Sequence, residues 1–321
     1  MNLISCDWGT SNFRLYLVDR SKLRVISSLS SHDGVKSVNL SWQKQSTMNR
    51  TDFFWQFLQK QIKTLAEQGE GRLAGLPVII SGMASSSIGM LELPYAQLPF
   101  AIGGEDLVYH KFSARSEEGH DLYLVSGLAS SSDVMRGEET QIIGLQNTIR
   151  QKKALVILPG THSKHIHIAE GKVLSFSTFM TGELFATTSK TTILAHSVQA
   201  CDLNDSPLFE AFKQGVESVD KHGYLAALFK VRTRTLLAAT SDEQNFAFLS
   251  GIHLGEELRQ LRKLDSGTEV ILCAEPKMAL LYRLALQSLD IQLNSYVVPG
   301  ELSKLVTVYG HLAMAQHLNI D

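Results

Sequence analysis

The sequence predicts the α/β class, because strand-like and helix-like segments alternate along the chain. Short apolar runs such as Leu3–Cys6 and Ala154–Leu158 have the length of buried strands, and polar turn residues follow them closely. Longer segments such as Thr51–Glu67 repeat apolar residues at helical spacing. The chain has 321 residues, more than the ~250–300 at which one hydrophobic core stops growing, so we expect two domains.

The first half is expected to open with a β-hairpin. Phe13–Val18 alternates apolar and polar residues, as a strand does, and Gly9 supplies the turn after Leu3–Cys6. Thr51 and Asp52 can cap the first helix. The other predicted elements of this half are strands at Arg24–Leu29, Pro77–Ile80 and Leu122–Val125, Ser-rich loops at 81–89 and 126–132, and a helix at Glu138–Thr148.

The second half is expected to open in the same way. The buried strand Ala154–Leu158 runs into a polar turn, and a hairpin follows around Glu170 and Gly171. The other predicted elements are strands at His165–Ala169, Lys172–Ser177 and Glu269–Cys273, and helices at Leu208–Val219, Ala247–Arg262, Lys277–Leu289 and Ser303–Leu318. The pairs Gly9-Thr10 and Gly160-Thr161 occupy the two equivalent turns, so two similar halves with a ligand held in a cleft are predicted.

Composition excludes several classes of protein. With 30 basic and 32 acidic residues, the net charge of −2 does not fit a strongly basic nucleic-acid binder or an acidic disordered chain. No apolar run approaches the ~20 residues that a bilayer helix needs, and the first residues lack the pattern of a signal peptide. Three distant cysteines predict no disulfide framework. We therefore expect a cytoplasmic protein without nucleic-acid or membrane partners; a homodimer stays open.

The first polar turn, Asp7–Asn12, has the chemistry of a phosphate site. Gly9 lets an anion approach the backbone N–H groups, and Thr10 and Ser11 add hydroxyl donors. Asp7 can hold a hydrated Mg²⁺ beside a phosphate. An ordinary hairpin with an aspartate at a strand end is the alternative.

The second polar turn, Gly160–Lys164, is a candidate for a second phosphate site, with Lys164 as a point charge. It is not a P-loop, because the sequence contains no GxxxxGK[ST] motif. A strand-end turn with a surface lysine is the alternative.

Acidic residues at the predicted start of a helix, Glu138 and Glu139, could accept a proton from a substrate hydroxyl. The alternative is that they only interact with the helix dipole. The Ser-rich loops are either flexible turns or a hydroxyl-lined wall for a polyol or sugar acid. His162, His165 and His167 do not share one face, so no zinc site is expected.

Several blocks of sequence carry a resemblance to a known family. The stretch 7–14 resembles the first phosphate motif of the actin and hexokinase type of ATPase superfamily. More narrowly, the chain resembles the 2-dehydro-3-deoxygalactonokinases over nearly its whole length. The matching blocks are SGMASSSIG at 81–89, VMRGEETQIIG at 134–144, LPGTHSK at 158–164, FMTGEL at 179–184 and FLSGIHLGEE at 248–257.

The resemblance implies two ribonuclease H-like, actin-like ATPase domains with mixed sheets flanked by helices and a cleft between them. The first would span residues 1–150 and the second 151–300, and the helix at 301–321 would pack back on the first. It also implies an ATP- and Mg²⁺-dependent kinase that phosphorylates 2-dehydro-3-deoxy-D-galactonate to its 6-phosphate in galactonate catabolism.

Residue roles follow from the resemblance, position by position. Glu138 is the expected base, with Glu139 as the fallback, and Asp7 lies near Mg²⁺. The nucleotide and its phosphates would contact Gly9, Thr10, Ser11, Gly160, Thr161, Lys164 and Ala274. The substrate carboxylate and hydroxyls would contact Asn12, Arg14, Ser86, Ser87 and Arg136.

The chain departs from the pattern after Ala274, where Glu275 and Pro276 replace the small residues of the adenosine motif. Two alternatives therefore stay open. One is a non-catalytic or regulatory relative with impaired ATP binding, and the other is a kinase of another sugar acid.

Overall fold

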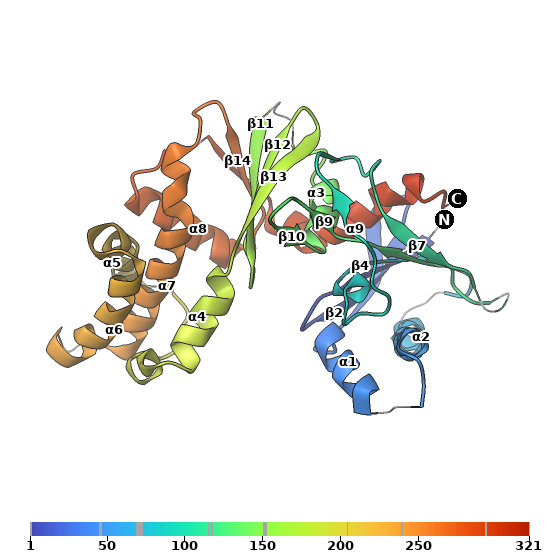
Figure 1. Cartoon of the computed structure of the whole chain (residues 1–321), viewed down its shortest axis with the longest axis horizontal. Coiled ribbons are helices and arrows are strands. Elements are labelled where there is room, and N and C mark those ends of the chain that lie inside the picture. The colour runs from blue at the N-terminus through green and yellow to red at the C-terminus, as the bar shows by residue number, and fades with distance from the viewer. Residues whose placement is uncertain are drawn as a thin grey trace. The chain divides into compact units, whose positions relative to one another are not determined.

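A computed structural model of the chain describes residues 2–44, 47–68, 73–114, 116, 118–149, 153–203, 205–238, 240–292 and 294–320. The chain packs as two compact units (Figure 1). The first contains Met1–Lys152, Ile168–Phe176 and Lys304–Asp321, and the second contains Lys153–His167 and Ser177–Ser303. Within the described residues, none of the helices combines the length and apolarity needed to cross a bilayer.

The first unit is built on a mixed sheet in which β1 is central. β1 pairs antiparallel with β2 and parallel with β4, and Asp7 lies opposite Arg14 on one side and Ser81 on the other. The strand order is β3-β2-β1-β4-β8-β7. These strands are β1 (Asn2–Trp8), β2 (Phe13–Asp19), β3 (Arg24–Ser31), β4 (Val78–Gly82), β8 (Leu122–Val125) and β7 (Tyr109–Phe112).

Small elements complete the first unit. β5 (Ala96–Gln97), β9 (Leu128–Ala129) and β10 (Val134–Met135) form a three-stranded sheet, and β6 (Phe100–Ala101) pairs with Lys172 and Val173. The helices are α1 (Val35–Lys44), α2 (Arg50–Gln68), a short 3₁₀ helix (Met83–Ser85), α3 (Glu138–Gly144) and α9 (Gly300–His317). α2 presents its apolar face to β2 and β3, where Phe54, Trp55 and Leu58 join the core around Trp8.

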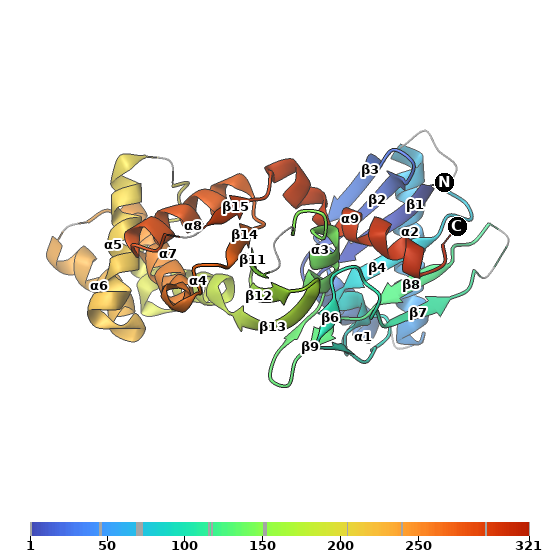
Figure 2. The same ribbon diagram turned by 90° about the horizontal axis from the view of Figure 1, so that it is seen from above.

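The end of the chain returns to α3. A Cβ on Gly144 would lie 2.0 Å from the Val306 oxygen, and a Cβ on Gly310 would lie 2.1 Å from the Thr140 oxygen. Glycines therefore permit the close approach of α9 to α3, which Figure 2 shows from above. His311 of α9 also hydrogen-bonds Ser5 of β1 through Nδ1, at 2.7 Å in the buried interior.

The second six-stranded sheet carries the strands of the second unit, with the segment Ile168–Phe176, from β12 into β13, grouped with the first unit. This sheet repeats the strand order of the first, because it runs β15-β14-β11-β12-β13, and β6 adds to the edge of β13. This order is equivalent to β8-β4-β1-β2-β3, so both units have the arrangement of a ribonuclease H-like sheet. The strands are β11 (Lys153–Leu158), β12 (Ser163–Ala169), β13 (Lys172–Phe179), β14 (Glu269–Leu272) and β15 (Ser295–Val297).

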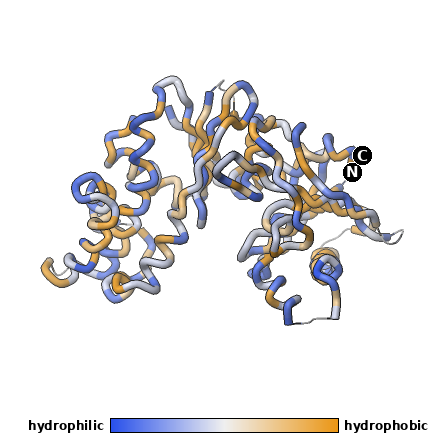
Figure 3. Tube along the Cα trace, in the orientation of Figure 1, coloured by the Kyte–Doolittle hydropathy of each residue, from blue (hydrophilic) through white to orange (hydrophobic). Residues whose placement is uncertain are grey.

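Helices supply the rest of the second unit, and Figure 3 shows hydrophilic and apolar segments alternating along them. α5 and α7 cross closely at two glycines: a Cβ on Gly215 would lie 2.0 Å from the Phe248 oxygen, and one on Gly251 would lie 2.0 Å from the Phe212 oxygen. The elements are α4 (Thr181–Lys190), α5 (Ser206–His222), α6 (Tyr224–Ala238), α7 (Asp242–Leu258), α8 (Pro276–Ser288) and 3₁₀ helices at Ile193–Ser197 and Arg259–Lys263.

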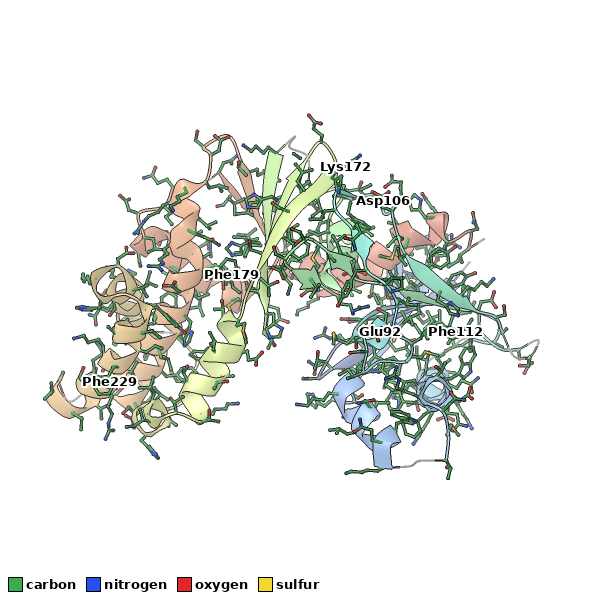
Figure 4. The ribbon with its side chains drawn as sticks, viewed as in Figure 1. Glu92, Asp106, Phe112, Lys172, Phe179 and Phe229 are labelled. Atoms are coloured by element: carbon green, nitrogen blue, oxygen red, sulfur yellow. The ribbon has the colours of Figure 1, made fainter. Side chains whose placement is uncertain are left out.

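The expected fold class, mixed sheets flanked by helices, is confirmed, and the predicted strand and helix positions agree with most of the elements. The helix predicted at Glu138–Thr148 is too long, because α3 ends at Gly144 and continues only as turns. Helices α1, α4 and α6 were not predicted. α4 buries only Thr188, and α6 exposes Phe229 (Figure 4) and Leu237, so neither has a clear apolar stripe.

Candidate active site

Two glycines bring three segments of the first unit together. Gly82, at the end of β4, has φ +91°, and a Cβ there would lie 2.8 Å from the Trp8 oxygen. Gly137, just before α3, has φ +107°, and its Cβ would lie 3.4 Å from the Gly82 Cα. Both backbones favour glycine. The ends of β1 and β4 therefore lie beside the start of α3, which carries Glu138.

Asp7 and Glu138 form a pair of interacting carboxylates. The Asp7 side chain is 21% exposed, and its Oδ2 accepts a hydrogen bond from Arg14 at 3.0 Å. Restricted access to water raises the pKa of Asp7, Arg14 opposes that rise, and the negative charge of Glu138 adds to it. The structure thus places the predicted metal ligand within electrostatic range of the predicted base.

The two neighbouring glutamates of α3 have different surroundings. Glu138 is partly exposed, and its Oε2 accepts from the Arg136 N–H at 3.0 Å. Glu139 is 1% exposed. Its two oxygens accept from the Gly137 N–H at 2.9 and 2.7 Å, and Thr140 donates to Oε1. Glu138 is therefore the more accessible carboxylate, while Glu139 turns back onto the start of its own helix.

Glu139 is expected to make stability depend on pH. Burial, then repulsion from Glu138, raises its pKa from 4.5 to about 7. The folded state therefore takes up a proton between these values, and stability falls as pH rises from about 4.5 to about 7. A shift of this size corresponds to about 3 kcal/mol, and Glu139→Gln loses a hydrogen bond of ~1 kcal/mol. We expect the variant to be about 2 kcal/mol more stable at pH 8.

Urea unfolding of both proteins at pH 5 and pH 8 measures this difference. At pH 5 the Glu139 carboxyl is protonated in the folded state, so the gain of the variant should disappear. An equal difference in stability at the two pH values would contradict the ionisation of Glu139 as the cause.

The first polar turn, Asp7–Asn12, is hydrogen-bonded by the start of α1. The Val35 N–H donates to the Gly9 oxygen at 2.9 Å, and the Lys36 N–H donates to the Thr10 oxygen at 3.1 Å. A Cβ on Gly34 would lie 2.3 Å from that Thr10 oxygen, so the helix start is pressed against the turn. Thr10, Ser11 and Asn12 are exposed, and the Asn12 side chain contacts His32 at 3.1 Å.

The Ser-rich loop at 81–89 is hydrogen-bonded to Arg136. Its guanidinium donates to the Ser85 backbone oxygen at 2.6 Å and to the Ser85 hydroxyl at 2.8 Å, and it stacks 4.1 Å from the Tyr95 ring centre. The Ser86 hydroxyl donates to the Met83 oxygen, whereas Ser87 is exposed. Of the predicted substrate contacts, Arg136 and Ser86 therefore already have partners within the first unit, as do Arg14 and Asn12.

The second polar turn, Gly160–Lys164, contacts the start of α4 in a similar way. The Glu183 N–H donates to the Thr161 oxygen at 3.0 Å, and a Cβ on Gly182 would lie 2.5 Å from the Gly160 oxygen. Gly160 and Thr161 are exposed, and His162 Nε2 hydrogen-bonds the Glu183 carboxylate.

Lys164 is 3% exposed and donates from Nζ to the His162 oxygen at 3.0 Å. Lys164, which was predicted to bind phosphate, is therefore buried and stabilises the second polar turn by this hydrogen bond.

A pocket of about 180 Å³ adjoins the second turn and is lined mainly by apolar side chains. Gly160 and Gly182 lie at its border. Its other lining residues come from α4, α7, α8 and nearby loops: Pro159, Thr181, Phe185, Leu203, Phe246, Ser250, His253, Leu254, Met278, Leu281 and Tyr282. Its volume is below the ~300–1,000 Å³ of sites that enclose a drug-sized ligand, so it suits one part of a ligand, such as a flat base. A larger open hollow of about 540 Å³ near Arg262 contains none of the predicted site residues.

The residues that depart from the family pattern do not fill this pocket. Ala274 is buried at the end of β14. Glu275 is exposed and precedes α8, where Pro276 starts the helix. Glu275 does not line the pocket. The carboxylate that made adenosine binding doubtful therefore lies outside the pocket.

A metal ion would have few direct ligands here. Across the residues that the structure describes, no group of three or more His, Cys, Asp or Glu side chains is arranged to hold one. Asp7 offers a partly exposed carboxylate oxygen, which fits a hydrated Mg²⁺ that keeps most of its water.

Sequence reasoning missed Gly34, Gly182 and the pocket residues of α7 and α8. Gly34 and Gly182 each stand directly beside a helix start, but the contact of that helix with a turn is non-local. The blocks at 179–184 and 248–257 matched a family pattern, and this was the only signal for the pocket.

Comparisons with known proteins agree with one another. The family model described as 2-keto-3-deoxy-galactonokinase matches residues 7–306. The chain is 33% identical over 296 residues to a probable 2-dehydro-3-deoxygalactonokinase of Rhizobium meliloti (strain 1021), covering 90% of each protein. It is 29% identical over 301 residues to the 2-dehydro-3-deoxygalactonokinase of Escherichia coli (strain K12), covering 91% of each. A crystal structure assigned to this activity from Sinorhizobium meliloti is similar with a TM-score of 0.77 and 28% identity, covering 98% of this chain and 96% of that one.

Proposed function

Because this chain belongs to the 2-keto-3-deoxy-galactonokinase family, and so is a carbohydrate kinase, we propose that it phosphorylates 2-dehydro-3-deoxy-D-galactonate on its 6-hydroxyl with ATP. The product would be the 6-phosphate, an intermediate of galactonate catabolism. The observation that carries the proposal is that Glu138, at the start of α3, lies beside the strand ends that carry Asp7, since Gly137 packs on Gly82 and the charge of Glu138 acts on the Asp7 carboxyl. Phosphoryl transfer needs positioning, charge neutralisation and a base. Glu138 would supply the base, and Asp7 would hold the Mg²⁺ that neutralises the phosphate charge.

Glu138 is proposed as the general base. Its carboxylate would accept the proton of the 6-hydroxyl while that oxygen bonds to the γ-phosphorus and the bond to the β-phosphate oxygen breaks. Glu138 is partly exposed, as a base that meets a substrate must be. Glu139 remains the fallback, but its oxygens are occupied by Gly137 and Thr140.

Asp7 is proposed to orient Mg²⁺ through water. The ion would neutralise the phosphate charge during transfer. Arg14 donates to Asp7 Oδ2, and the other carboxylate oxygen is proposed to face the hydrated ion.

The two polar turns are proposed to bind phosphate groups through backbone N–H groups. In a trans peptide the C=O and the following N–H point in opposite directions. The carbonyls of Gly9, Thr10 and Thr161 face the starts of α1 and α4. The N–H groups of Thr10, Ser11 and His162 therefore face the other way, where an anion could meet them.

The apolar pocket of the second unit is proposed to hold the adenine base. It adjoins Gly160, so a nucleotide with its base in the pocket would bring its phosphates to the second turn. Ala274 would contribute backbone close to the nucleotide, and Lys164 would act by supporting the turn. The substrate carboxylate and hydroxyls are assigned to Asn12, Arg14, Ser86, Ser87 and Arg136.

The test is an ADP-release assay with ATP, Mg²⁺ and 2-dehydro-3-deoxy-D-galactonate, with ³¹P NMR to locate the phosphate in the product. We expect turnover that stops when EDTA removes the divalent ion and returns with added Mg²⁺. A wider panel of sugar acids tests the alternative substrate. Absence of turnover on the whole panel, together with no ATP binding by calorimetry, would refute the kinase and support a non-catalytic relative. The exposed position of Glu275 argues against that relative.

A further inference from the structure

A buried polar cluster in the second unit is centred on Glu257, near the end of α7. The Glu257 side chain is 1% exposed. Its Oε1 accepts from the Ser163 hydroxyl at 2.8 Å and from the Tyr282 hydroxyl at 2.7 Å. The Thr181 hydroxyl donates to Oε2.

His165 is the fourth partner of this carboxylate. Its Nε2 lies 3.0 Å from Glu257 Oε1, and the Gln260 side-chain nitrogen lies 3.3 Å from its Nδ1. An amide N–H that donates to Nδ1 leaves the ring proton on Nε2, where it donates to Glu257. The ring of Phe179, at the end of β13 just before α4 (Figure 4), also contacts the His165 ring, at 4.6 Å between ring centres.

The cluster keeps Glu257 ionised. Burial by itself raises the pKa of a carboxyl, but the hydrogen bonds led by His165 outweigh that effect and hold the pKa of Glu257 below its ordinary value. A buried carboxylate with four donors is a costly arrangement when an apolar side chain could fill the same space. Stabilising the fold therefore does not explain why a carboxylate occupies this position, and the elements that Glu257 connects are the better guide to its role.

The partners of Glu257 lie at the two segments that hold the second turn. Ser163 is the first residue of β12, directly after the turn, and Thr181 is the first residue of α4. The next residues of α4, Gly182 and Glu183, are the ones that contact Gly160 and Thr161. One carboxylate thus ties the end of the turn to the helix that supports it.

The same carboxylate also reaches the apolar pocket. Thr181 and Tyr282 both donate to Glu257 and both line the pocket. Movement of Glu257 would therefore disturb the pocket wall and the second turn together.

We infer that Glu257 is a positioning residue for the nucleotide, which sets the second turn and the wall of the apolar pocket in one fixed arrangement. This inference rests on the proposed function, because it takes these two features as the nucleotide site. Glu257 touches neither reacting group, so its effect is on binding, through Ser163, Thr181 and Tyr282.

The principal variant is Glu257→Gln, which keeps the shape but turns one acceptor into a donor that faces other donors. We expect KM for ATP to rise about tenfold and the Kd of ADP, measured by calorimetry, to rise by the same factor. KM for the sugar acid should stay within about twofold. A folded variant with unchanged ADP affinity would overturn the inference, and so would an equal rise in both KM values.

A milder pair of variants decides the question if Glu257→Gln does not fold. Ser163 and Ser197 are both fully buried in the second unit, and each makes a hydrogen bond to one charged side chain: Ser163 to Glu257 and Ser197 to Arg232, at 3.1 Å. We expect Ser163→Ala to weaken ADP binding about threefold and Ser197→Ala to leave it unchanged. Equal ADP affinity in the two variants would overturn the inference.

Calorimetry with ADP separates this inference from the proposed reaction. Wild-type protein that binds ADP, with weaker binding in the Glu257 and Ser163 variants, supports the positioning role even if no sugar acid is turned over. Turnover of the sugar acid with normal ADP binding in both variants would refute the role of Glu257 and leave the kinase assignment intact.

Discussion

Glu138→Gln is expected to lower kcat by about 10²-fold or more and to leave KM for the sugar acid within about threefold. Glutamine keeps the size of the side chain and can still accept from the Arg136 N–H, so the start of α3 should be preserved. It cannot take up a proton, and phosphoryl transfer would then release the hydroxyl proton without a positioned acceptor. Steady-state kinetics with the coupled ADP assay measures this effect.

Two further variants control for the charge and place of Glu138. Glu301 also lies in the first turn of a helix, α9, and Glu301→Gln should have normal kinetics. Glu139→Gln decides between the two candidate bases, and we expect it to lose less than about tenfold in kcat. A normal kcat for Glu138→Gln with a large loss for Glu139→Gln would move the base to Glu139. Normal turnover in both would exclude a carboxylate base on α3.

Gly251→Ala is expected to destabilise the second unit by about 3 kcal/mol or more. The added Cβ would lie 2.0 Å from the Phe212 oxygen and 3.0 Å from the Val216 N, which are backbone atoms of α5 that cannot rotate away. The two helices would have to separate, and α5 and α7 form the main helix contact of this unit. Alanine gains only ~1 kcal/mol in helix propensity over glycine, which does not offset this cost.

Urea unfolding and thermal melting measure the loss, with Gly267→Ala as the matched control. Gly267 is exposed, and the nearest atom to its added Cβ is Asp265 Oδ1 at 3.9 Å, so its stability should change by less than ~0.5 kcal/mol. If Gly251→Ala melts at the wild-type temperature, the close crossing of α5 and α7 is wrong.

The central parts of the fold could be predicted because their signals are local. β1 and β11 each contain a short, mainly apolar run, and both are followed by polar residues around a Gly-Thr pair. α2 has a clear apolar face from Phe54 to Leu65. α1 is short, with only Val35 and Val38 as buried apolar residues, and α4 buries only Thr188. The contacts of their first residues with a polar turn distant in sequence leave no local pattern.

The sequence points to the two carboxylates of the candidate site but not to the residues that support it. Asp7 and Glu138 were identified from residue type and sequence context, and the structure brings them within electrostatic range. The inward direction of Lys164 could not be predicted, because a lysine after a turn is usually exposed. Glu257 was equally hidden, since its four partners come from β12, α4 and α8, which are distant in sequence.

The equivalent strand orders of the two units have an evolutionary consequence. Each of the two sheets has the same strand order, and in each a glycine at or just before the start of a later helix is pressed on the first polar turn. Duplication of an ancestral unit would produce this arrangement. In the first copy the residue two positions before the turn glycine is Asp7, and in the second copy it is Leu158. Divergence at this one position would leave a carboxylate in only one of the two equivalent sites. The first unit would then orient the cation, and the second would bind phosphate groups without a carboxylate beside them.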